Sequence, residues 1–302
     1  MDKTLLTRLN RIEQLARASR WKRLFYKPFV YVSAVLYKGL VYPIVKKEWH
    51  VRARTFFGAD MKVALPAATE LALLGAKSHD SEIRLTRFLL QHLQPGQIFV
   101  DVGGHFGFYT LLAAHLVGER GKVFTFEAAP RVFQILKSNT QALPQVEVFH
   151  QAVSETSGSL VFYEFPLSHS EYNTLLPVQF EQSEWFHKVP HQKVEVPSVC
   201  LDAFFDKVHS QPDFIKIDVE GAEFEVIKGA TSLLQQHKTV VAMEFLAAKR
   251  GNTEHYRAMA LLEKLGYQPY CIDRTGKLKP CSDVETHLAQ KGLDSDNIVF
   301  VK

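Results

Sequence analysis

The sequence predicts an α/β fold in which a mostly parallel sheet is covered by helices on both faces. From residue 98 onward, short apolar runs typical of buried strands alternate with longer segments typical of helices. A glycine turn directly follows the first run. The last two runs, YQPYCID and NIVFVK, are expected to form an antiparallel hairpin. Alternating strands and helices require right-handed crossovers, which bring ligand-binding turns to the carboxyl edge of the sheet.

Composition agrees with one large globular domain and an extension. The chain has 302 residues, of which 46% are hydrophobic and 23% are charged, and its formal net charge is +4. These values are ordinary for a globular protein, and the length is sufficient for a full sheet.

The most informative segment is a strand, a glycine turn and a helix in immediate succession. Residues 98–100 form a short apolar run suited to a buried parallel strand, and Gly103, Gly104 and Gly107 follow it. A helix is expected from about Phe108 to Val117. Its first backbone amides would point at any ligand that lies in the turn.

An acidic residue ends the second predicted strand. Glu127 lies twenty residues after Gly107. In nucleotide-binding sheets an acid near this position binds ribose hydroxyls. The sequence therefore predicts a ligand that carries a ribose.

The chemistry of the turn favours a cationic ligand over a phosphorylated one. His105 replaces the second glycine of the dinucleotide fingerprint G-x-G-x-x-G, so that fingerprint is broken. Asp101, two residues before Gly103, would repel a phosphate but attract a positive charge. S-adenosylmethionine carries an ammonium and a sulfonium but no phosphate, and it fits this turn better than a nicotinamide dinucleotide. The alternative is a glycine turn that only packs strand against helix.

Three segments, in this order and spacing, resemble the FkbM family of S-adenosylmethionine-dependent methyltransferases. They are IFVDVGGHFGFYT, FTFEAAPRVFQILKSNT and FIKIDVEGAEFEVIKGA. The resemblance covers about residues 80–302, including the helix that contains Glu82 and the closing DNIVFVK. The chain departs from the family pattern at Gly104 and His105, where an alanine and an asparagine are expected.

The resemblance implies a Rossmann-like class I methyltransferase fold, with a mostly parallel seven-stranded sheet and an antiparallel C-terminal strand. It implies methylation of a hydroxyl group on a sugar, a glycan or a secondary metabolite. We assign residues 81–302 to this domain and residues 1–80 to a basic, aromatic-rich helical extension. The resemblance places donor binding on four residues, Asp101, Gly103, Gly107 and Glu127. We add three residues that are expected nearby, Gly104, Ala152 and Asp218.

The middle of the domain is expected to contain a third strand and a hairpin. The third strand begins at Val146 and ends near Ala152, where adenine is expected to lie. Residues 160–165 and 193–199 form the hairpin. The long irregular segment between them suits a loop over the substrate; the alternative is a surface loop that has no part in substrate binding. Its polar and aromatic residues are His169, Tyr172, Asn173, Trp185, His187 and His191.

Three acidic residues around the start of a helix are candidates for proton transfer. Asp218 and Glu220 follow the strand at residues 214–218, and Glu223 lies in the first turn of the helix behind them. A methyltransferase must align an acceptor oxygen and remove its proton. The competing interpretation is structural, because acids at a helix N-terminus satisfy free amides.

Other residues near this edge of the sheet have weaker claims. His105 in the glycine turn is a fourth catalytic candidate. Glu244, at the end of a fifth strand expected at residues 239–245, is a lesser one. Lys216 is expected to keep the Asp218 carboxylate ionised. Asp218 with Glu244 could also hold a divalent ion, but the sequence has no ligand-rich cluster of the D-D-N type, so we expect no metal.

The three cysteines do not suggest a disulfide framework or a zinc site. Cys200, Cys271 and Cys281 are odd in number and lack C-x-x-C spacing. We expect reduced thiols in a cytosolic protein, because no secretory signal pattern is visible at the N-terminus.

The extension is basic and partly apolar. Residues 1–54 hold thirteen Lys or Arg and three acids. The apolar run at residues 24–45 is interrupted by Lys27 and Lys38 and contains Pro28 and Pro43, so a transmembrane helix is not expected. The favoured interpretation is a helical pair that packs on the domain; the alternative is an interfacial helix on an anionic membrane, which would place the protein at the inner face. Nothing indicates nucleic-acid binding.

Two other functions compete with methyl transfer. A nicotinamide-dependent oxidoreductase or epimerase would share the first strand, turn and helix but should keep the intact glycine fingerprint. A non-catalytic binding module would keep the sheet as a scaffold for a partner. The presence of Asp101, Gly103, Glu127 and Asp218 together argues against loss of activity.

Overall fold

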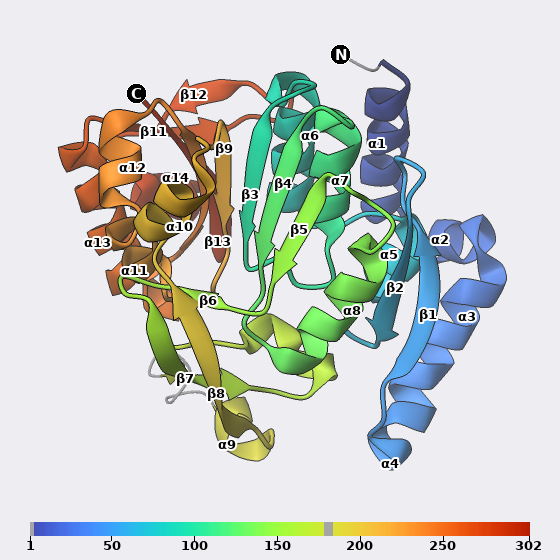
Figure 1. The fold of residues 1–302 in the computed structure, drawn as a ribbon. Helices are drawn as coiled ribbons and strands as arrows, with labels where there is room; N and C mark the ends of the chain where they lie inside the picture. The colour runs from blue at the N-terminus through green and yellow to red at the C-terminus, as the bar shows by residue number, and fades with distance from the viewer. Residues whose placement is uncertain (1–2, 178–183) are drawn as a thin grey trace.

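An eight-stranded sheet forms the centre of the protein (Figure 1). The computed structural model describes residues 3–177 and 184–302. The strands of the central sheet are β3 (Ile98–Val102), β4 (Lys122–Phe126), β5 (Val146–Phe149), β9 (Phe214–Ile217), β10 (Val240–Leu246), β11 (Gln268–Ile272), β12 (Leu278–Pro280) and β13 (Ser295–Val301).

The strand order is β12-β11-β13-β10-β9-β3-β4-β5. Strands β5, β4, β3, β9 and β10 are parallel, and β13 lies antiparallel between β10 and β11. This arrangement confirms the predicted mostly parallel sheet with an antiparallel C-terminal strand. The short edge strand β12 is added to the seven predicted strands.

The connection from β11 to β13 differs from the predicted direct hairpin. Strand β12 and helix α14 (Val284–Lys291) lie between them, although β11 and β13 do pair antiparallel. The helix begins where the Asp283 side chain accepts a hydrogen bond of 2.9 Å from the Thr286 backbone nitrogen. An acidic N-cap of this kind is a local helix signal that the hairpin prediction overlooked.

Helices cover both faces of the sheet and form two apolar cores. Alternate residues of β3 point to opposite faces, so Phe99 joins one core and Val100 the other. Helices α6 (Asp80–His92), α7 (Phe108–Val117) and α8 (Pro130–Thr140) contribute to the first core. The helices of the second core are α10 (Leu201–Val208), α11 (Glu223–Lys228), α12 (Thr231–Gln236), α13 (Thr253–Lys264) and α14.

The helix predicted behind Asp218 and Glu220 is divided into two, α11 and α12, which are separated at Gly229 and Ala230. A Cβ atom on Gly229 would lie 2.2 Å from the Ser154 carbonyl oxygen, so the chain at Ser154 approaches this junction closely enough to require glycine.

A second, three-stranded sheet lies beside the carboxyl edge of the central one (Figure 1). It contains β6 (Ala152–Val153), β7 (Gly158–Glu164) and β8 (Gln192–Val199), and the antiparallel β7–β8 pair confirms the predicted hairpin. The predicted third strand is wrong at its end, because β5 stops at Phe149 and Ala152 pairs with β8 instead.

The segment between β7 and β8 is more regular than expected. It contains the 3₁₀ helix η2 (Leu167–Tyr172) and the short helix α9 (Glu184–Lys188). Part of the predicted substrate loop, residues 178–183, lies outside the described residues.

The N-terminal extension is not entirely helical. Helices are followed by a two-stranded hairpin, which the prediction of a helical extension missed. The Gly58 backbone, at a φ of 95°, turns the chain between its strands. These elements are α1 (Lys3–Ala16), α2 (Arg20–Tyr26), α3 (Pro28–Leu36), η1 (Tyr37–Val41), α4 (Tyr42–Val45), β1 (Trp49–Arg54), β2 (Asp60–Leu65) and α5 (Thr69–Leu74).

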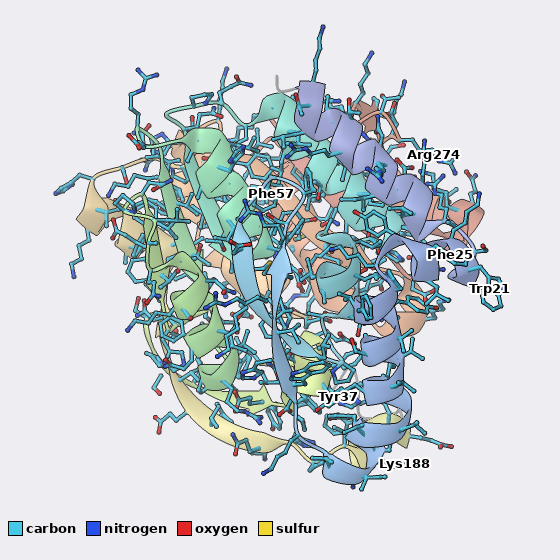
Figure 2. All side chains as sticks on the ribbon, turned by 90° about the vertical axis from the view of Figure 1, so that its right-hand side faces the viewer. Trp21, Phe25, Tyr37, Phe57, Lys188 and Arg274 are labelled. Atoms are coloured by element: carbon cyan, nitrogen blue, oxygen red, sulfur yellow. A yellow bond between two sulfur atoms is a disulfide. The ribbon has the colours of Figure 1, made fainter. Side chains whose placement is uncertain are left out.

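The extension packs on the rest of the protein at its first helix. Leu5, Leu9 and Ile12 of α1 join the first core, and Glu13 accepts a hydrogen bond of 2.6 Å from Arg87 of α6. Figure 2 shows α1 lying over this side of the protein.

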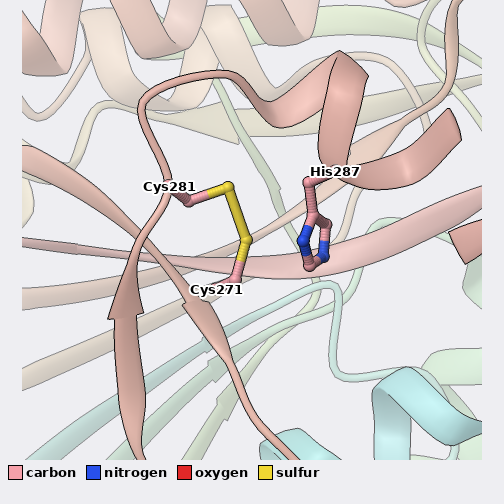
Figure 3. A group of neighbouring side chains, drawn as sticks. All are labelled: Cys271, Cys281 and His287. Atoms are coloured by element: carbon pink, nitrogen blue, oxygen red, sulfur yellow. A yellow bond between two sulfur atoms is a disulfide. The ribbon is translucent and has the colours of Figure 1, made fainter. Parts of the chain in front are cut away.

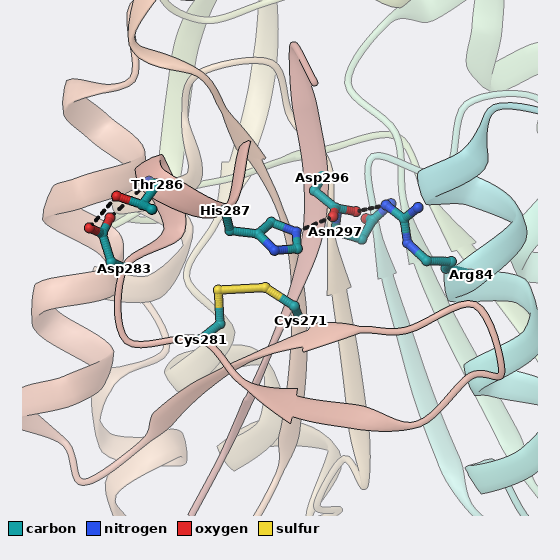
Figure 4. Close-up of a disulfide and its surroundings, with 8 residues drawn as sticks. All are labelled: Arg84, Cys271, Cys281, Asp283, Thr286, His287, Asp296 and Asn297. Carbon is teal, nitrogen blue, oxygen red and sulfur yellow. Dashed lines mark hydrogen bonds and ion pairs between the residues drawn. A yellow bond between two sulfur atoms is a disulfide. The ribbon is translucent and has the colours of Figure 1, made fainter. Parts of the chain in front are cut away.

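Two cysteines form a disulfide, so the prediction of three reduced thiols is wrong for them. Cys271 of β11 is bonded to Cys281, and their Cα atoms are 5.6 Å apart because β11 and β12 form a hairpin (Figure 3). Cys200 is free. Beside the disulfide, Asp296 bonds His287 at 2.8 Å and Arg84 at 2.5 Å (Figure 4).

Candidate active site

A cavity of about 440 Å³ lies at the carboxyl ends of the parallel strands. This is the edge at which α/β sheets bind ligands. Its walls come from the β3–α7 turn, the ends of β4 and β10, the β9–α11 turn, the loops before α6 and after β5, and η2. The lining residues that matter below are Lys77, Glu82, Gly103, His105, Glu127, Ala128, Gln151, Ala152, Val153, Ser170, Glu171, Asp218, Glu220, Glu244 and Arg250.

The three glycines of the turn have different roles. Gly103 lines the cavity with a φ of 79°, and a Cβ atom on it would lie 1.9 Å from the Asp218 carbonyl oxygen. A Cβ on Gly104 would meet Thr125 at 2.3 Å, and one on Gly107 would meet Leu136 at 2.9 Å. Gly104 and Gly107 therefore let the turn pack on β4 and α8, and Gly103 is the one that borders the large cavity.

Asp101 lies beneath the turn. Its side chain is fully buried, accepts a hydrogen bond of 2.7 Å from Thr110, and lies 3.4 Å from Lys216 Nζ. Lys216 in turn donates a hydrogen bond of 3.1 Å to the Gly103 carbonyl oxygen. Asp101 does not line the cavity and instead supports the turn through Lys216.

Glu127 borders the cavity at the end of β4. Its carboxylate accepts backbone hydrogen bonds from His105 at 2.8 Å and from Ala129 at 2.9 Å. Burial raises the pKa of Glu127 to about 7, although these two bonds favour the ionised form. Each oxygen keeps a free lone pair, so the group can still accept hydroxyl donors.

His105 contacts the wall opposite the turn. Its backbone has a φ of 49°, and its Nε2 forms a hydrogen bond of 2.8 Å with Ser170 Oγ of η2. Burial and the charge of Lys77 lower the pKa of His105 to about 3. The ring is therefore neutral at physiological pH and is a weak proton acceptor.

Asp218 is an ionised carboxylate held between two lysines. Lys216 Nζ lies 3.2 Å and Lys77 Nζ 3.9 Å from Asp218 Oδ2. Burial alone would raise the pKa of Asp218, but the charges of Lys216 and Lys77 lower it to about 2. Lys216 thus lies beside this carboxylate, where the prediction requires it.

Glu220 and Glu244 lie beside Asp218 and have the opposite tendency. Burial and the negative charges of Glu244 and Asp218 raise the pKa of Glu220 well above its usual value. Burial and the charge of Asp218 raise the pKa of Glu244 to about 8. Arg250 Nη2, 3.9 Å from Glu220 Oε2, provides a partial counter-charge. Glu244 is therefore mostly protonated at neutral pH, and the raised pKa of Glu220 favours its protonated form as well.

Carboxylate oxygens of Asp218, Glu220 and Glu244 lie within 4.8 Å of one another. Lys77 and Lys216 balance the charge of Asp218. A cluster of this kind favours a positively charged ligand, because such a ligand stabilises the ionised form of each acid.

Glu223 lies behind the cavity wall. It is fully buried and accepts backbone hydrogen bonds from Val219 at 3.2 Å and from Gly221 at 3.0 Å. His255 Nε2 is 3.2 Å from Glu223 Oε2, the oxygen that also accepts from Gly221. Burial raises the pKa of Glu223 to about 7. Its observed contacts hold the β9–α11 turn in place.

Several cavity residues were missed by sequence reasoning. Lys77 lies 3.4 Å from Glu82 of α6, and both border the cavity together with Arg250 from the segment before α13. Lys77 and Arg250 reach the site from segments with no motif of their own, so no sequence signal marks them. Glu82 belongs to a helix that the family resemblance includes.

The predicted substrate loop contributes one of its named residues, Asn173, to the cavity. Three other residues of the same loop, Ser170, Glu171 and Leu175, also border it. Trp185 and Tyr172, whose ring centroids are 4.4 Å apart, instead belong to an aromatic group. Its members are Tyr163, Phe165, Tyr172, Trp185 and Phe186, with the rings of His169, His187 and His191 beside it.

Comparison with known families identifies the family to which the chain belongs. The model of the methyltransferase FkbM domain matches residues 101–269, from Asp101 of β3 to Pro269 of β11. The chain belongs to this family. The matched region contains the glycine turn, Glu127 and the β9–α11 turn, and it excludes the whole N-terminal extension.

One curated relative has a name that refers to a sugar. The hexuronic acid methyltransferase AglP of Haloferax volcanii is 25% identical over 158 residues, which is 51% of this chain and 59% of that protein. The chain therefore spans less than two thirds of that relative.

Solved structures with related folds include three methyltransferases. The FkbM methyltransferase of Methylobacillus flagellatus has 14% identity, covers 75% of this chain and 56% of that one, and gives a TM-score of 0.42. The O-methyltransferase of Bacillus cereus, in complex with SAH, has 14% identity, coverages of 72% and 80%, and a TM-score of 0.40. An S-adenosylmethionine-dependent O-methyltransferase of Thermotoga maritima has 13% identity, coverages of 72% and 64%, and a TM-score of 0.39.

Proposed function

We propose that this FkbM-family protein transfers a methyl group from S-adenosylmethionine to a hydroxyl group of a sugar or glycan. The observation that carries the proposal is the cavity at the sheet edge, in which Gly103, Glu127 and Asp218 meet. Family membership supports methyl transfer, and the cavity chemistry supports this donor.

The residues around the turn fit S-adenosylmethionine. Glu127 offers buried carboxylate lone pairs to ribose hydroxyls beside Gly103. Ala128, Ala152 and Val153 offer an apolar wall for adenine. The remaining predicted donor residues, Asp101, Gly104 and Gly107, would act by shaping the turn.

The charges of the cavity also fit a cationic donor. Asp218, Glu220 and Glu244 form the acidic side of the cavity, and the two nearby lysines are within ion-pair distance of carboxylates. The ionised Asp218 would repel a pyrophosphate placed on this side of the cavity. This distinction argues against the nicotinamide-dependent alternative.

We assign a different role in the reaction to each acidic residue of the cavity. S-adenosylmethionine, when bound, supplies a methyl group already activated by its sulfonium. Asp218, ionised by its lysine neighbours, would accept a hydrogen bond from the acceptor hydroxyl and orient it. Glu244, whose pKa is about 8, would take the proton, because a cation in the cavity favours its ionised form. Glu220 would share this proton as a coupled neighbour.

The other two catalytic candidates take supporting roles in this proposal. His105 links the glycine turn to η2 through Ser170 and so joins the donor and acceptor sides of the cavity. Glu223 holds the turn that carries Asp218 and Glu220.

The acceptor is proposed from the relative's name and from the cavity. The matched protein of Haloferax volcanii is named for a hexuronic acid. Arg250 and Lys77 supply positive charge on the cavity wall, which suits a sugar that carries a carboxylate. We place the reaction in the cytosol, where the donor is made.

Ligand-induced stabilisation and labelled methyl transfer test this function. The melting temperature should rise with S-adenosylmethionine and S-adenosylhomocysteine but not with NAD. Isotope from labelled donor should then enter sugars that carry hexuronic acid, tested beside neutral sugars and fractionated cell extract. Stabilisation by NAD alone would favour an oxidoreductase, and donor binding without transfer to any fraction would favour a binding module.

A further inference from the structure

The helices at residues 20–47 expose an unusually apolar surface. Trp21, Phe25 and Phe29 are 71%, 79% and 89% exposed, and Figure 2 shows Trp21 and Phe25 at the outer edge of the protein. The stripe continues along α3, η1 and α4 at spacings of three and four residues, through Val32, Leu36, Leu40 and Ile44. We call these seven residues the apolar face.

The opposite side of the same helices packs on the protein. Ala34 is buried, and Val30, Tyr31 and Tyr37 pack against the first core. Helix α3 lies against α5. One side of these helices therefore packs on the domain, as the favoured prediction expects. The other side is apolar and exposed.

The surroundings of the apolar face are basic. Residues 20–47 contain seven Lys or Arg and no Asp or Glu. Lys22, Lys38, Lys46 and Lys47 are exposed. Basic residues around an apolar helical stripe are complementary to the headgroups and acyl chains of an anionic bilayer. A protein partner would not require this combination.

The helix is better suited to lie on a bilayer than to cross it. Residues Pro28–Val45 are apolar and long enough by composition to be a candidate span. Eighteen residues extend only about 27 Å, less than the hydrocarbon core of about 30 Å. Lys38 lies at the middle, and one side of the helix is attached to the protein, so lipid cannot surround it in this structure.

We propose that the apolar face docks this enzyme onto an anionic phospholipid bilayer as a peripheral protein. The aromatic side chains enter the headgroup and upper acyl region, and the exposed lysines contact anionic headgroups. Two signals together, apolar insertion and basic attraction, give stable but reversible attachment.

Docking also bears on the acceptor, and this step rests on the proposed function. Tyr42 of α4 forms a hydrogen bond with Ser168 of η2, and the next residues of η2, Ser170 and Glu171, border the cavity. Burial raises the pKa of Glu171, and the charge of Lys38 opposes this effect. The helices that carry the apolar face thus lie next to the part of the cavity wall formed by η2. This position favours an acceptor held at the membrane surface, such as a lipid-linked sugar.

Vesicle co-sedimentation of the full chain tests the docking proposal without measuring methyl transfer. The protein should sediment with phosphatidylcholine vesicles that contain phosphatidylglycerol, and much less with phosphatidylcholine alone. Added salt should weaken binding, because the lysine contribution is screened. Absence of binding to the mixed vesicles at low salt would overturn the proposal.

Two pairs of matched variants separate the apolar and basic contributions. Phe25→Asp with Leu40→Asp should weaken vesicle binding about 100-fold. Val161→Asp, at an apolar residue of β7 that is 54% exposed, should leave binding unchanged. Charge reversal to Glu at the four exposed lysines around the apolar face, Lys22, Lys38, Lys46 and Lys47, should weaken vesicle binding about 100-fold or more. The same reversal at exposed lysines elsewhere, Lys207, Lys238, Lys264 and Lys279, should have a much smaller effect.

Two further readouts exclude other occupants of the face. Sodium carbonate should release the protein from membranes, whereas resistance to extraction would show a transmembrane helix instead. Sedimentation equilibrium should give the same oligomeric state for the wild type and for Phe25→Asp with Leu40→Asp. A dimer that this variant dissociates, with no vesicle binding, would show that a second copy covers the face. Loss of donor binding would refute the proposed function and leave the vesicle result standing.

Discussion

The Glu127 carboxylate accepts the backbone N–H of His105 at 2.8 Å. The acid that ends β4 therefore holds the glycine turn that follows β3, and both border the same cavity. A ribose bound to Glu127 would lie beside the turn. This relationship makes Glu127 the side chain on which donor affinity should depend most.

Replacement of Glu127 by alanine should weaken binding of S-adenosylmethionine by about 10-fold to 100-fold, since hydrogen bonds to charged groups contribute about 1.5–3 kcal/mol. Titration calorimetry measures the change. Glu147→Ala, at an exposed acid on the neighbouring strand β5, is the matched control and should bind like the wild type. An unaltered isotherm for Glu127→Ala would reject the ribose assignment.

Donor affinity should increase with pH. Glu127 and Glu244 have pKa values of about 7 and about 8 in the ligand-free protein, so both are largely protonated at pH 6. A cationic ligand favours their ionised forms and releases protons. Affinity should rise between about pH 6 and about pH 8, and calorimetry in buffers of different ionisation enthalpy should detect proton release. Proton uptake on binding would contradict this charge assignment.

Replacement of Asp218 by asparagine should reduce turnover by about 100-fold or more and leave donor affinity within a few fold, because the charge that orients the acceptor is lost. Labelled methyl transfer under saturating donor measures turnover. Asp206→Asn, at an exposed position of α10, serves as the control. Normal turnover in Asp218→Asn would remove this residue from the mechanism.

Glu223 should make folding stability depend on pH. Its pKa is about 7 in the folded protein, above its ordinary value of 4.5. A raised pKa gives stability that is present below pH 4.5 and lost as pH rises through about 7. Urea unfolding should therefore show the free energy of unfolding falling over this range, by up to about 1.4 kcal/mol per pH unit from this group.

The two Glu223 variants should differ in a diagnostic way. Glu223→Gln keeps an oxygen acceptor for the turn and should make the decline with pH shallower. Glu223→Ala leaves the Val219 and Gly221 amides without their acceptor and should cost about 1–3 kcal/mol at any pH. Identical pH profiles for the wild type and Glu223→Gln would contradict the buried protonated state.

The disulfide should be detectable by alkylation and by stability. In unfolded protein without reductant, mass spectrometry should find one modified cysteine, Cys200, and reduction should expose Cys271 and Cys281. Replacing both paired cysteines by alanine should lower the unfolding free energy by about 2–3 kcal/mol, because the crosslink restricts the unfolded chain. Cys200→Ala is the control. Three alkylated cysteines before reduction would show that the bond does not form.

The sequence predicted the elements whose signals are local. Helix α7 begins after Gly107, as expected, because the glycine turn fixes the backbone geometry at the start of this helix. Glu127 was assigned to the cavity from its spacing alone. The predicted end of the third strand was wrong, since Ala152 pairs with β8, which lies far away in the sequence.

Long-range contacts explain what the sequence did not reveal. Lys77 and Arg250 reach the cavity from opposite parts of the chain, and neither lies in a motif. Cys271 and Cys281 are brought together by the short pairing of β11 with β12, which no cysteine spacing rule indicates. Glu223 resembled a catalytic acid in sequence, but its observed hydrogen bonds go to backbone amides behind the wall.

A crystal structure of the protein with S-adenosylhomocysteine tests the central claim most directly. We expect the ligand beside Gly103, with its ribose hydroxyls on Glu127 and its adenine against Ala152. A ligand bound elsewhere, or a pyridine nucleotide in this cavity in its place, would contradict the claim.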